Sequence, residues 1–288
     1  MIERLAVIGV GLIGGSVALA LRETGSVKTV VGCGRSEENL IQAKRLGIVD
    51  HYTHDVGEAV EGADMVLLAV PLGAMRETLS GMRDHLKSNA VVTDAGSVKG
   101  SVIEDLREVF GEVPSWFVPG HPIAGTERSG ADAAFASLYQ NRRVILTPTS
   151  ETEAKAVSRV EEMWQQCGAD ITRMLVEHHD EILAATSHLP HMLAFSLVDS
   201  LARLKDNDEI FRYAAGGFRD FTRIASSNPV MWRDICLANQ DHLSAMLTRF
   251  ADELHELAAT LDQGDSEDLL EIFERAKRAR DRYVDGVE

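Results

Sequence analysis

The sequence has little cysteine. Its 288 residues include only Cys33, Cys167 and Cys236, which are far apart and odd in number. This pattern excludes a disulfide framework and a CxxC metal site, and it is typical of a protein in the reducing cytoplasm. We therefore expect three small buried thiols in a cytoplasmic protein.

Long apolar runs are also missing. No segment reaches the ~20 apolar residues that are needed to span a bilayer. The uncharged stretch of residues 5–21 could alternatively be a secretory signal peptide, because residues 18–20 (ALA) resemble a cleavage site. Four glycines would weaken such a helix, and a strand, a turn and a helix explain the stretch better. We expect no membrane association.

Positive charge is scarce. The chain has 29 Lys and Arg against 45 Asp and Glu, a net charge of −16. An acidic surface disfavours nucleic acid and anionic membranes. The expected partner is a small molecule, and a site for an anionic one must concentrate its own cations.

Two kinds of hydrophobic pattern follow one another along the chain. Short apolar runs at 5–8, 29–31, 65–70, 90–93 and 144–146 alternate with amphipathic stretches such as 73–86 and 102–110. Such alternation predicts a parallel sheet with crossover helices. After about residue 172 long helices are expected at 176–205, 229–261 and 267–284, with Pro229 just inside a helix that Ser227 or Asn228 caps. The predicted fold is an α/β Rossmann-type dinucleotide-binding domain (1–172) followed by an all-α helical domain (173–288), packed together because no Gly/Pro-rich linker separates them.

The first turn matches G-x-G-x-x-G and lies between a strand and a helix. Gly9 permits the tight turn, Gly11 lets the backbone approach a diphosphate, and Gly14 lets the helix pack on the sheet. The helix N-terminus offers free N–H groups to the phosphates. The expected dinucleotide-binding residues at the ends of the first and third strands are Gly9, Gly11, Leu12, Ile13, Gly14, Val70 and Pro71.

An acidic residue is missing after the second strand, where NAD-binding folds usually place one for the ribose hydroxyls. Gly34 occupies that position, followed by Arg35 and Ser36. An arginine there suits a 2′-phosphate. NADP is therefore favoured slightly over NAD, although Glu37 or Glu38 leaves NAD open.

Four segments contain more polar residues than the fold alone requires: 93–99, 120–127, 186–191 and 216–223. A histidine of near-neutral pKa suits proton removal from a hydroxyl that loses hydride, a serine can orient the oxygen, and arginine can clamp a carboxylate. His188 and His191 are spaced for one helix face, but no carboxylate completes a metal-ligand pattern, so no metal is expected. We interpret His178 and His179 as structural residues.

The motifs together resemble the prephenate/arogenate (cyclohexadienyl) dehydrogenase family of tyrosine biosynthesis. The matching segments are GVGLIGGS at 9–16, TDAGSVK at 93–99, GHPIAGTERSG at 120–130, SHLPH at 187–191 and GGFRDFTRIASSNPVMWRDI at 216–235. The resemblance implies hydride transfer to NAD(P)+ with loss of the ring carboxylate as CO2, giving 4-hydroxyphenylpyruvate or tyrosine. It implies dimerisation through the helical domain.

The resemblance also implies roles for individual residues. His121 is expected to take the ring hydroxyl proton, with Ser97 beside it and also at the cofactor. Arg223 is expected to clamp a substrate carboxylate, and Asp180 to orient a histidine one or more turns along its helix. The other residues implied on the substrate side are Ser187, His188, His191, Thr126, Glu127 and Trp232, with Asp220 as a further pocket or gating residue.

Several alternatives stay open. Another NAD(P)-dependent two-domain hydroxyacid-type dehydrogenase would share the nucleotide half, but such enzymes often use a lysine base, and the helix that carries His188 has only Lys205, near its end. A non-catalytic dinucleotide sensor would have no reason to keep Ser97, His121 and Arg223 together. The chain ends at Glu288, soon after its last helix, so neither a regulatory ACT domain nor a fused mutase is expected. The motifs do not separate prephenate from arogenate, nor show whether tyrosine competes at the site.

Overall fold

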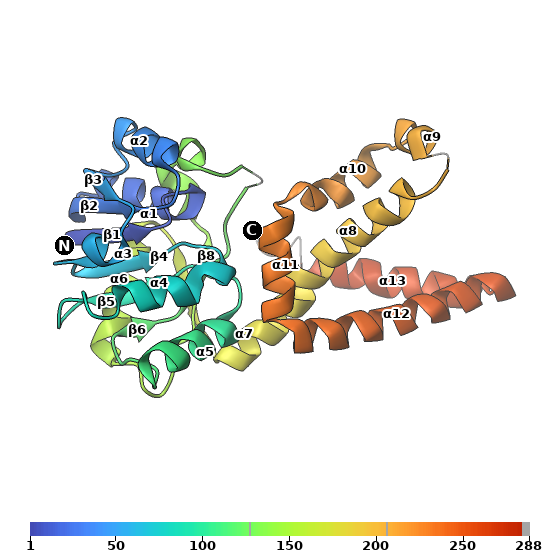
Figure 1. The fold of residues 1–288 in the computed structure, drawn as a ribbon. Helices are drawn as coiled ribbons and strands as arrows, with labels where there is room; N and C mark the ends of the chain where they lie inside the picture. Colours follow the sequence, from blue (N-terminus) through green and yellow to red (C-terminus); the bar gives the residue numbers. More distant parts are fainter. Residues whose placement is uncertain (127, 206, 284–288) are drawn as a thin grey trace. The chain divides into compact units, whose positions relative to one another are not determined.

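The computed structural model describes residues 1–126, 128–205 and 207–283. The chain forms two compact units, residues 1–240 and 241–288. The first unit holds both sheets and the helices up to α11, and the second holds nearly all of α12 (Gln240–Gln263) and α13 (Ser266–Tyr283) (Figure 1). In the described part of the chain, no helix is both long enough and apolar enough to cross a membrane.

The larger sheet of the first unit has six parallel strands in the order β3-β2-β1-β4-β5-β6. Its strands are β1 (Ile2–Ile8), β2 (Val27–Cys33), β3 (His51–Thr53), β4 (Met65–Leu68), β5 (Val91–Asp94) and β6 (Phe117–Val118). The order reverses between β1 and β4, which is the switch point where dinucleotides bind in folds of this type. The Rossmann-type arrangement predicted for the N-terminal part is confirmed.

Apolar cores cover both faces of this sheet. Successive side chains of a strand point to opposite faces, so Leu5 and Val7 join one core while Ala6 and Ile8 join the other. The helices of the first core are α1 (Leu12–Glu23), α2 (Glu37–Arg45) and α6 (Ala154–Gln166). Those of the second are α3 (Val56–Val60), α4 (Met75–Met82) and α5 (Lys99–Phe110).

The carboxyl ends of four strands are in register. Ile8 at the end of β1 pairs with Cys33 of β2 and Leu68 of β4, and Leu68 pairs with Asp94 of β5. The loops that follow these strands therefore leave the sheet along one edge. This edge carries the Gly9 turn, the 34–36 segment, residues 70–71 and the loop of residues 95–98.

A second sheet corrects one prediction. The apolar run at 144–146 was expected in the parallel sheet, but it lies in a separate three-stranded sheet of β7 (Gly120–Pro122), β8 (Arg143–Leu146) and β9 (Asp170–Arg173). β7 and β8 are antiparallel, and β8 and β9 are parallel. Neither an apolar run nor its length shows which neighbour it pairs with, because pairing depends on distant segments.

After Arg173 the described residues form helices and loops, but not three long helices. Residues 176–202 divide into α7 (Val176–Leu183), the π-helical turn η4 (Ala184–His188) and α8 (Leu189–Ala202). The 229–261 helix is interrupted at Asn239, between α11 (Pro229–Ala238) and α12. Short helices α9 (Asn207–Arg212), α10 (Gly216–Thr222) and η5 (Arg223–Ser226) had not been predicted. The cap of α11 is Asn228, whose side chain accepts from the N–H groups of Val230 and Met231.

Candidate active site

The turn between β1 and α1 has the geometry of a phosphate cradle. Gly9 has φ +99°, and a Cβ there would overlap the carbonyl oxygen of Ala69. A Cβ on Gly14 would overlap Gly9, whereas a Cβ on Gly11 would meet no protein atom. No side chain caps the start of α1, so its first N–H groups are available to an anion. The turn fits a dinucleotide diphosphate.

Four other predicted cofactor residues lie around this turn. Leu12 and Ile13 begin α1; Leu12 is buried, and the carbonyl of Ile13 accepts from the Tyr139 hydroxyl at 2.7 Å. Val70 and Pro71 follow β4, and the backbone nitrogen of Val70 borders Gly9.

The loop after β2 exposes Arg35. Ser36 caps α2 by accepting from the N–H of Asn39 at 3.2 Å. Glu37 accepts from the Tyr52 hydroxyl at 2.9 Å and pairs with the His54 ring. The hydrogen bond from His54, and to a smaller extent that from Tyr52, lowers the pKa of Glu37. The Glu37 carboxylate is therefore engaged by neighbours within the protein.

A buried ion pair joins β5, α5 and β7. Lys99 donates to the Asp94 carboxylate and, at 2.6 Å, to the carbonyl of Gly120. Asp94 also accepts from the N–H groups of Gly96 and Gly120, at 2.8 and 3.1 Å. Lys99 and Asp94 are fully buried, and this burial lowers the pKa of Lys99 although Asp94 opposes the shift. The network fixes the backbone on either side of Ser97 and immediately before His121.

His121 lies in a buried chain of polar side chains. Its Nδ1 is 2.9 Å from Nε2 of His179, and His179 Nδ1 is 2.6 Å from Asp180 Oδ1. Burial, with smaller effects of His179, Lys99 and His188, lowers the pKa of His121 well below its ordinary value of 6.5. The imidazole is therefore neutral at pH 7 and can accept a proton.

The contact between His179 and His121 was not predicted from the sequence. We interpreted His179 as structural, yet it is fully buried against His121, a residue 58 positions earlier in the chain. Asp180 was expected to orient a histidine one or more turns away; that was wrong, because it binds its neighbour His179. The only local signal was the His179-Asp180 pair itself.

A second buried group forms where η4, α8 and α11 meet. His191 stacks on Trp232 with ring centroids 3.6 Å apart, and His188 meets the same indole edge-on at 6.1 Å. Asn239 Nδ2 donates to His188 Nδ1 at 3.1 Å. The His188 Nε2 and Trp232 Nε1 atoms are buried without a hydrogen-bond partner among the described residues. Each of these two buried atoms is therefore open to a further hydrogen bond.

The two groups adjoin one another. Trp232 and Ile235 pack against Val98, the residue after Ser97. Asn239 Nδ2 also donates to the backbone carbonyl of Asp180 at 2.8 Å. The structure therefore brings the 94–99 loop, the His121 strand and the His188–His191 segment together.

The remaining predicted residues are placed as follows. Ser97 and Ser187 are half-buried, and the Ser187 carbonyl accepts from His191 Nδ1 at 2.8 Å. Thr126 and Arg223 are exposed and are not members of the buried groups; Thr126 accepts from the N–H of Arg128, and Arg223 begins η5. Asp220 is exposed on α10. Glu127 lies outside the described residues. In the described ranges, no three His, Cys, Asp or Glu side chains are arranged to hold a metal ion.

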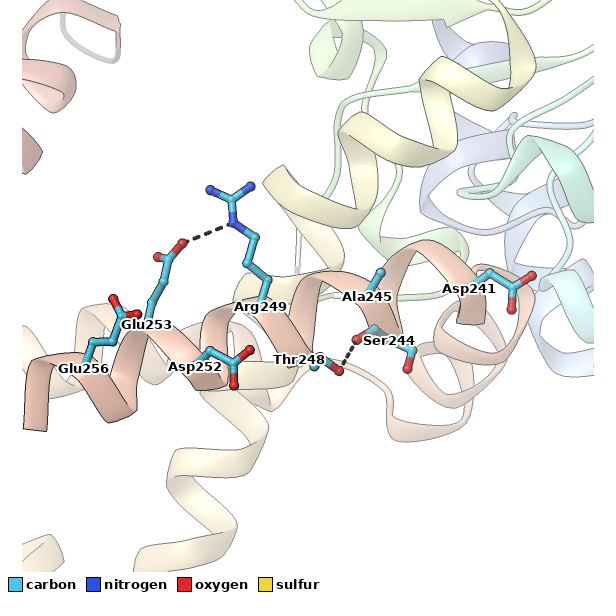
Figure 2. A pocket seen from close by; sticks show the side chains of 8 residues that line it. All are labelled: Asp241, Ser244, Ala245, Thr248, Arg249, Asp252, Glu253 and Glu256. Atoms are coloured by element: carbon cyan, nitrogen blue, oxygen red, sulfur yellow. Dashed lines mark hydrogen bonds and ion pairs between the residues drawn. The ribbon is translucent and has the colours of Figure 1, made fainter.

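An open trough on α12 is a poor alternative site. Half of its lining residues are acidic (Figure 2): the lining is formed by Asp241, Ser244, Ala245, Thr248, Arg249, Asp252, Glu253 and Glu256. The single arginine is paired with Glu253 at 3.1 Å. Four carboxylates would repel a diphosphate or a carboxylate substrate.

Comparisons with known proteins point to one enzyme family. Residues 17–173 match the prephenate dehydrogenase nucleotide-binding domain, and residues 176–275 match the prephenate dehydrogenase dimerization domain. A cyclohexadienyl dehydrogenase of Zymomonas mobilis subsp. mobilis is 41% identical over 96% of this chain and 95% of its own length.

Solved structures are similar over nearly the whole chain. Prephenate dehydrogenase from A. aeolicus, in complex with hydroxyphenyl propionate and NAD+, superposes with a TM-score of 0.90 at 37% identity, covering 97% of this chain and 98% of the other. Synechocystis arogenate dehydrogenase gives 0.81 at 29% identity, covering 98% and 100%.

Proposed function

The chain belongs to the prephenate dehydrogenase family, and we propose that it oxidises and decarboxylates prephenate, arogenate or both, in tyrosine biosynthesis. It is an NAD(P)-dependent oxidoreductase. The observation that carries the proposed chemistry is the neutral, buried His121 beside the 94–99 loop at the carboxyl edge of the nucleotide-binding sheet.

His121 acts as the proton acceptor in this proposal, and Ser97 orients the substrate hydroxyl. The bound nicotinamide accepts the hydride from the hydroxyl-bearing ring carbon. His121 takes the hydroxyl proton as the carbonyl forms. The electrons of the breaking bond to CO2 then make the ring aromatic, and His121 returns the proton to the phenol oxygen. Aromatisation drives the step, so no metal is required.

The second buried group is proposed to hold the rest of the substrate. The N–H of Trp232 and Nε2 of His188 lack hydrogen-bond partners within the described protein and suit oxygen acceptors. We assign the carboxylate clamp to Arg223, and we propose Ser187, His191, Thr126 and Glu127 as further substrate-binding residues. The family motifs at 120–130, 187–191 and 216–235 support these roles.

NADP is the slightly favoured cofactor in our proposal, with NAD accepted. Arg35 is exposed next to Ser36, and the neighbouring Glu37 carboxylate is held by Tyr52 and His54 instead of facing a ribose. A 2′-phosphate would therefore meet the Arg35 guanidinium, while the Glu37 carboxylate is held by its own partners.

We further propose a cytoplasmic homodimer that joins through its helical domain, residues 173–288, with residues 1–172 as the nucleotide-binding domain. The dimer is supported by the match of residues 176–275 to a dimerization domain. All three cysteines are free thiols; Cys33 and Cys167 are buried as expected, but Cys236 is only half-buried.

The test is a spectrophotometric assay of reduced cofactor formation with prephenate and with arogenate, each with NAD and NADP. Turnover of either substrate with release of CO2 supports the proposal, and the four rates rank the substrates and cofactors. No turnover with either substrate, by a folded protein that binds dinucleotide, contradicts it.

A further inference from the structure

We propose that His179 and Asp180 are positioning residues that hold His121 as the Nδ1–H tautomer and leave its Nε2 bare for the substrate hydroxyl. This inference rests on the proposed function only in assigning the proton acceptor to His121. The tautomer itself follows from the hydrogen-bond chain and can be measured without turnover.

Asp180 is the anchored end of the chain. Its Oδ1 accepts from the N–H of Lys99 at 2.8 Å and its Oδ2 from the N–H of Gly100 at 2.7 Å, so a side chain of α7 caps α5. The cap residue of α5 itself, Val98, has no polar side chain for this task. Burial alone would raise the pKa of Asp180, but hydrogen bonds from His179 and these two N–H groups bring it below its ordinary value. Asp180 is therefore a carboxylate that only accepts.

An accepting Asp180 determines the proton on His179. With Asp180 Oδ1 only 2.6 Å away, His179 Nδ1 must carry its hydrogen, because two acceptors at that distance would repel. Burial lowers the pKa of His179, so at pH 7 the ring is neutral and its Nε2 is bare. His179 therefore presents an acceptor to His121.

The tautomer of His121 follows in the same way. Its Nδ1, 2.9 Å from the bare Nε2 of His179, must donate. A neutral His121 then has its lone pair on Nε2. Reversing the His121–His179 hydrogen bond would put the proton on Nε2 and make the ring a donor, which cannot remove a hydroxyl proton.

The same chain accommodates the proton during the reaction. When His121 Nε2 takes the hydroxyl proton, the Nδ1–H bond is already directed at His179 Nε2. A shift of that second proton leaves His121 neutral and makes His179 an imidazolium bonded to the Asp180 carboxylate. The positive charge then lies on His179, directly beside the Asp180 carboxylate, which stabilises it. The other titratable and charged groups around the two rings are Lys99 of α5, Asp94 of β5 and His188 of η4.

The first test is 15N NMR of the histidine rings in the full-length protein at pH 7, with the His121 signals assigned by their loss in His121→Gln. We expect protonated-type Nδ1 and bare-type Nε2 signals for His121 in the wild type. In His179→Leu, both tautomers should be populated. A wild-type His121 with its hydrogen on Nε2 overturns the proposal, whatever the activity.

The second test is kinetic. His179→Leu should lower kcat by roughly 100-fold, within the ~10²–10⁴ range of a general base, with KM changed by less than about threefold. The acid limb of the kcat/KM profile should move to lower pH, because a buried imidazolium without an acceptor is harder to form. His179→Gln should restore kcat to within about tenfold of the wild type, since its amide oxygen can accept from Nδ1–H.

His178→Leu is the matched control. It changes the neighbouring residue of α7, whose exposed ring lies 3.5 Å from Glu181, and kcat should stay at the wild-type value. A folded His179→Leu with wild-type kcat and an unmoved acid limb overturns the proposal. If His121→Asn retains full activity while NMR shows the Nδ1–H tautomer, the assignment of the proton acceptor fails and the positioning of the ring stands.

Discussion

A single side chain, His121, carries the chemistry that we propose. We expect His121→Asn to lower kcat by about 10²–10⁴-fold, because an amide cannot accept a proton at neutral pH. Binding of prephenate and dinucleotide should persist. The measurement is steady-state kinetics, with His178→Asn as a control on an exposed histidine outside the buried chain. Near-normal kcat in His121→Asn would refute the assigned role.

A substitution of the single residue Arg35 tests the proposed preference for NADP. Arg35→Ala should raise KM for NADP about tenfold or more, because a charged contact to the 2′-phosphate is worth roughly 1.5–3 kcal/mol, and should leave KM for NAD nearly unchanged. Arg45→Ala, at the far end of α2, removes an exposed arginine whose side chain donates to Gln42 and should affect neither KM. Equal effects on both cofactors would contradict a 2′-phosphate contact.

Titration of the single residue His188 should make the stability of the protein depend on pH. Burial lowers its pKa from 6.5 to about 4. Because the unfolded chain then binds the proton first, the stabilisation present at pH 7 is lost as the pH falls from 6.5 towards 4. At pH 5 the loss is about 2 kcal/mol from this group, at ~1.4 kcal/mol per pKa unit.

Urea unfolding at pH 7 and pH 5 measures this loss. The free energy of unfolding should fall by about 2 kcal/mol more in the wild type than in His188→Gln, which cannot titrate. Comparing the change in the free energy of unfolding between pH 7 and pH 5 in the two proteins cancels the effect of the substitution on packing, which is the same at both pH values. An equal change in the wild type and in His188→Gln would show that His188 titrates alike in the folded and unfolded chains.

At the scale of the elements, the two glycines Gly11 and Gly14 of the β1–α1 turn are expected to have different roles, one in binding the dinucleotide and one in stability. Gly11→Ala adds a methyl that meets no protein atom, so Tm should hardly change while the Kd for dinucleotide rises about tenfold, equivalent to ~1.4 kcal/mol. Gly14→Ala forces a methyl onto the Gly9 carbonyl and the Val7 side chain and should destabilise the fold by about 1–3 kcal/mol.

Thermal unfolding without ligand and titration of dinucleotide fluorescence distinguish the two glycines. Each variant is the control for the other, because they lie three residues apart in the same turn. Unchanged dinucleotide affinity in Gly11→Ala would argue that the backbone does not approach a diphosphate there.

For the whole molecule the main prediction is the oligomeric state. We expect sedimentation to give twice the chain mass of 31.5 kDa. Phe273 and Leu270 on α13 are 59% and 58% exposed, and apolar side chains of this size are usually covered in a helical dimer. Phe273→Asp should therefore shift the protein towards the monomer.

Arg275→Asp is the control for this change, since residue 275 points to the other side of α13 from residue 273. It should leave the dimer intact. A wild-type monomer at micromolar concentration would contradict the proposed assembly, and a Phe273→Asp dimer would move the interface away from this face of α13.

Local features of the chain determined much of the fold and part of the site. The spacing of Gly9, Gly11 and Gly14 predicted the cofactor turn, because tight turns, close approach and helix packing act over a few residues. Pro229 after Asn228 predicted a helix start for the same reason. The motifs at 93–99, 120–130 and 187–191 predicted the family, and with it the reaction.

The tertiary structure decided what depends on distant contacts. The run 144–146 entered a second sheet because β7 supplied its partner, and the 176–205 helix was divided at η4, placing His188 against Trp232 and Asn239. His179 was assigned as structural because nothing local shows that it meets His121. A hydrogen-bond chain from α5 through Asp180 and His179 to His121 exists only once three separate segments pack together, so its chemistry is a property of the folded chain.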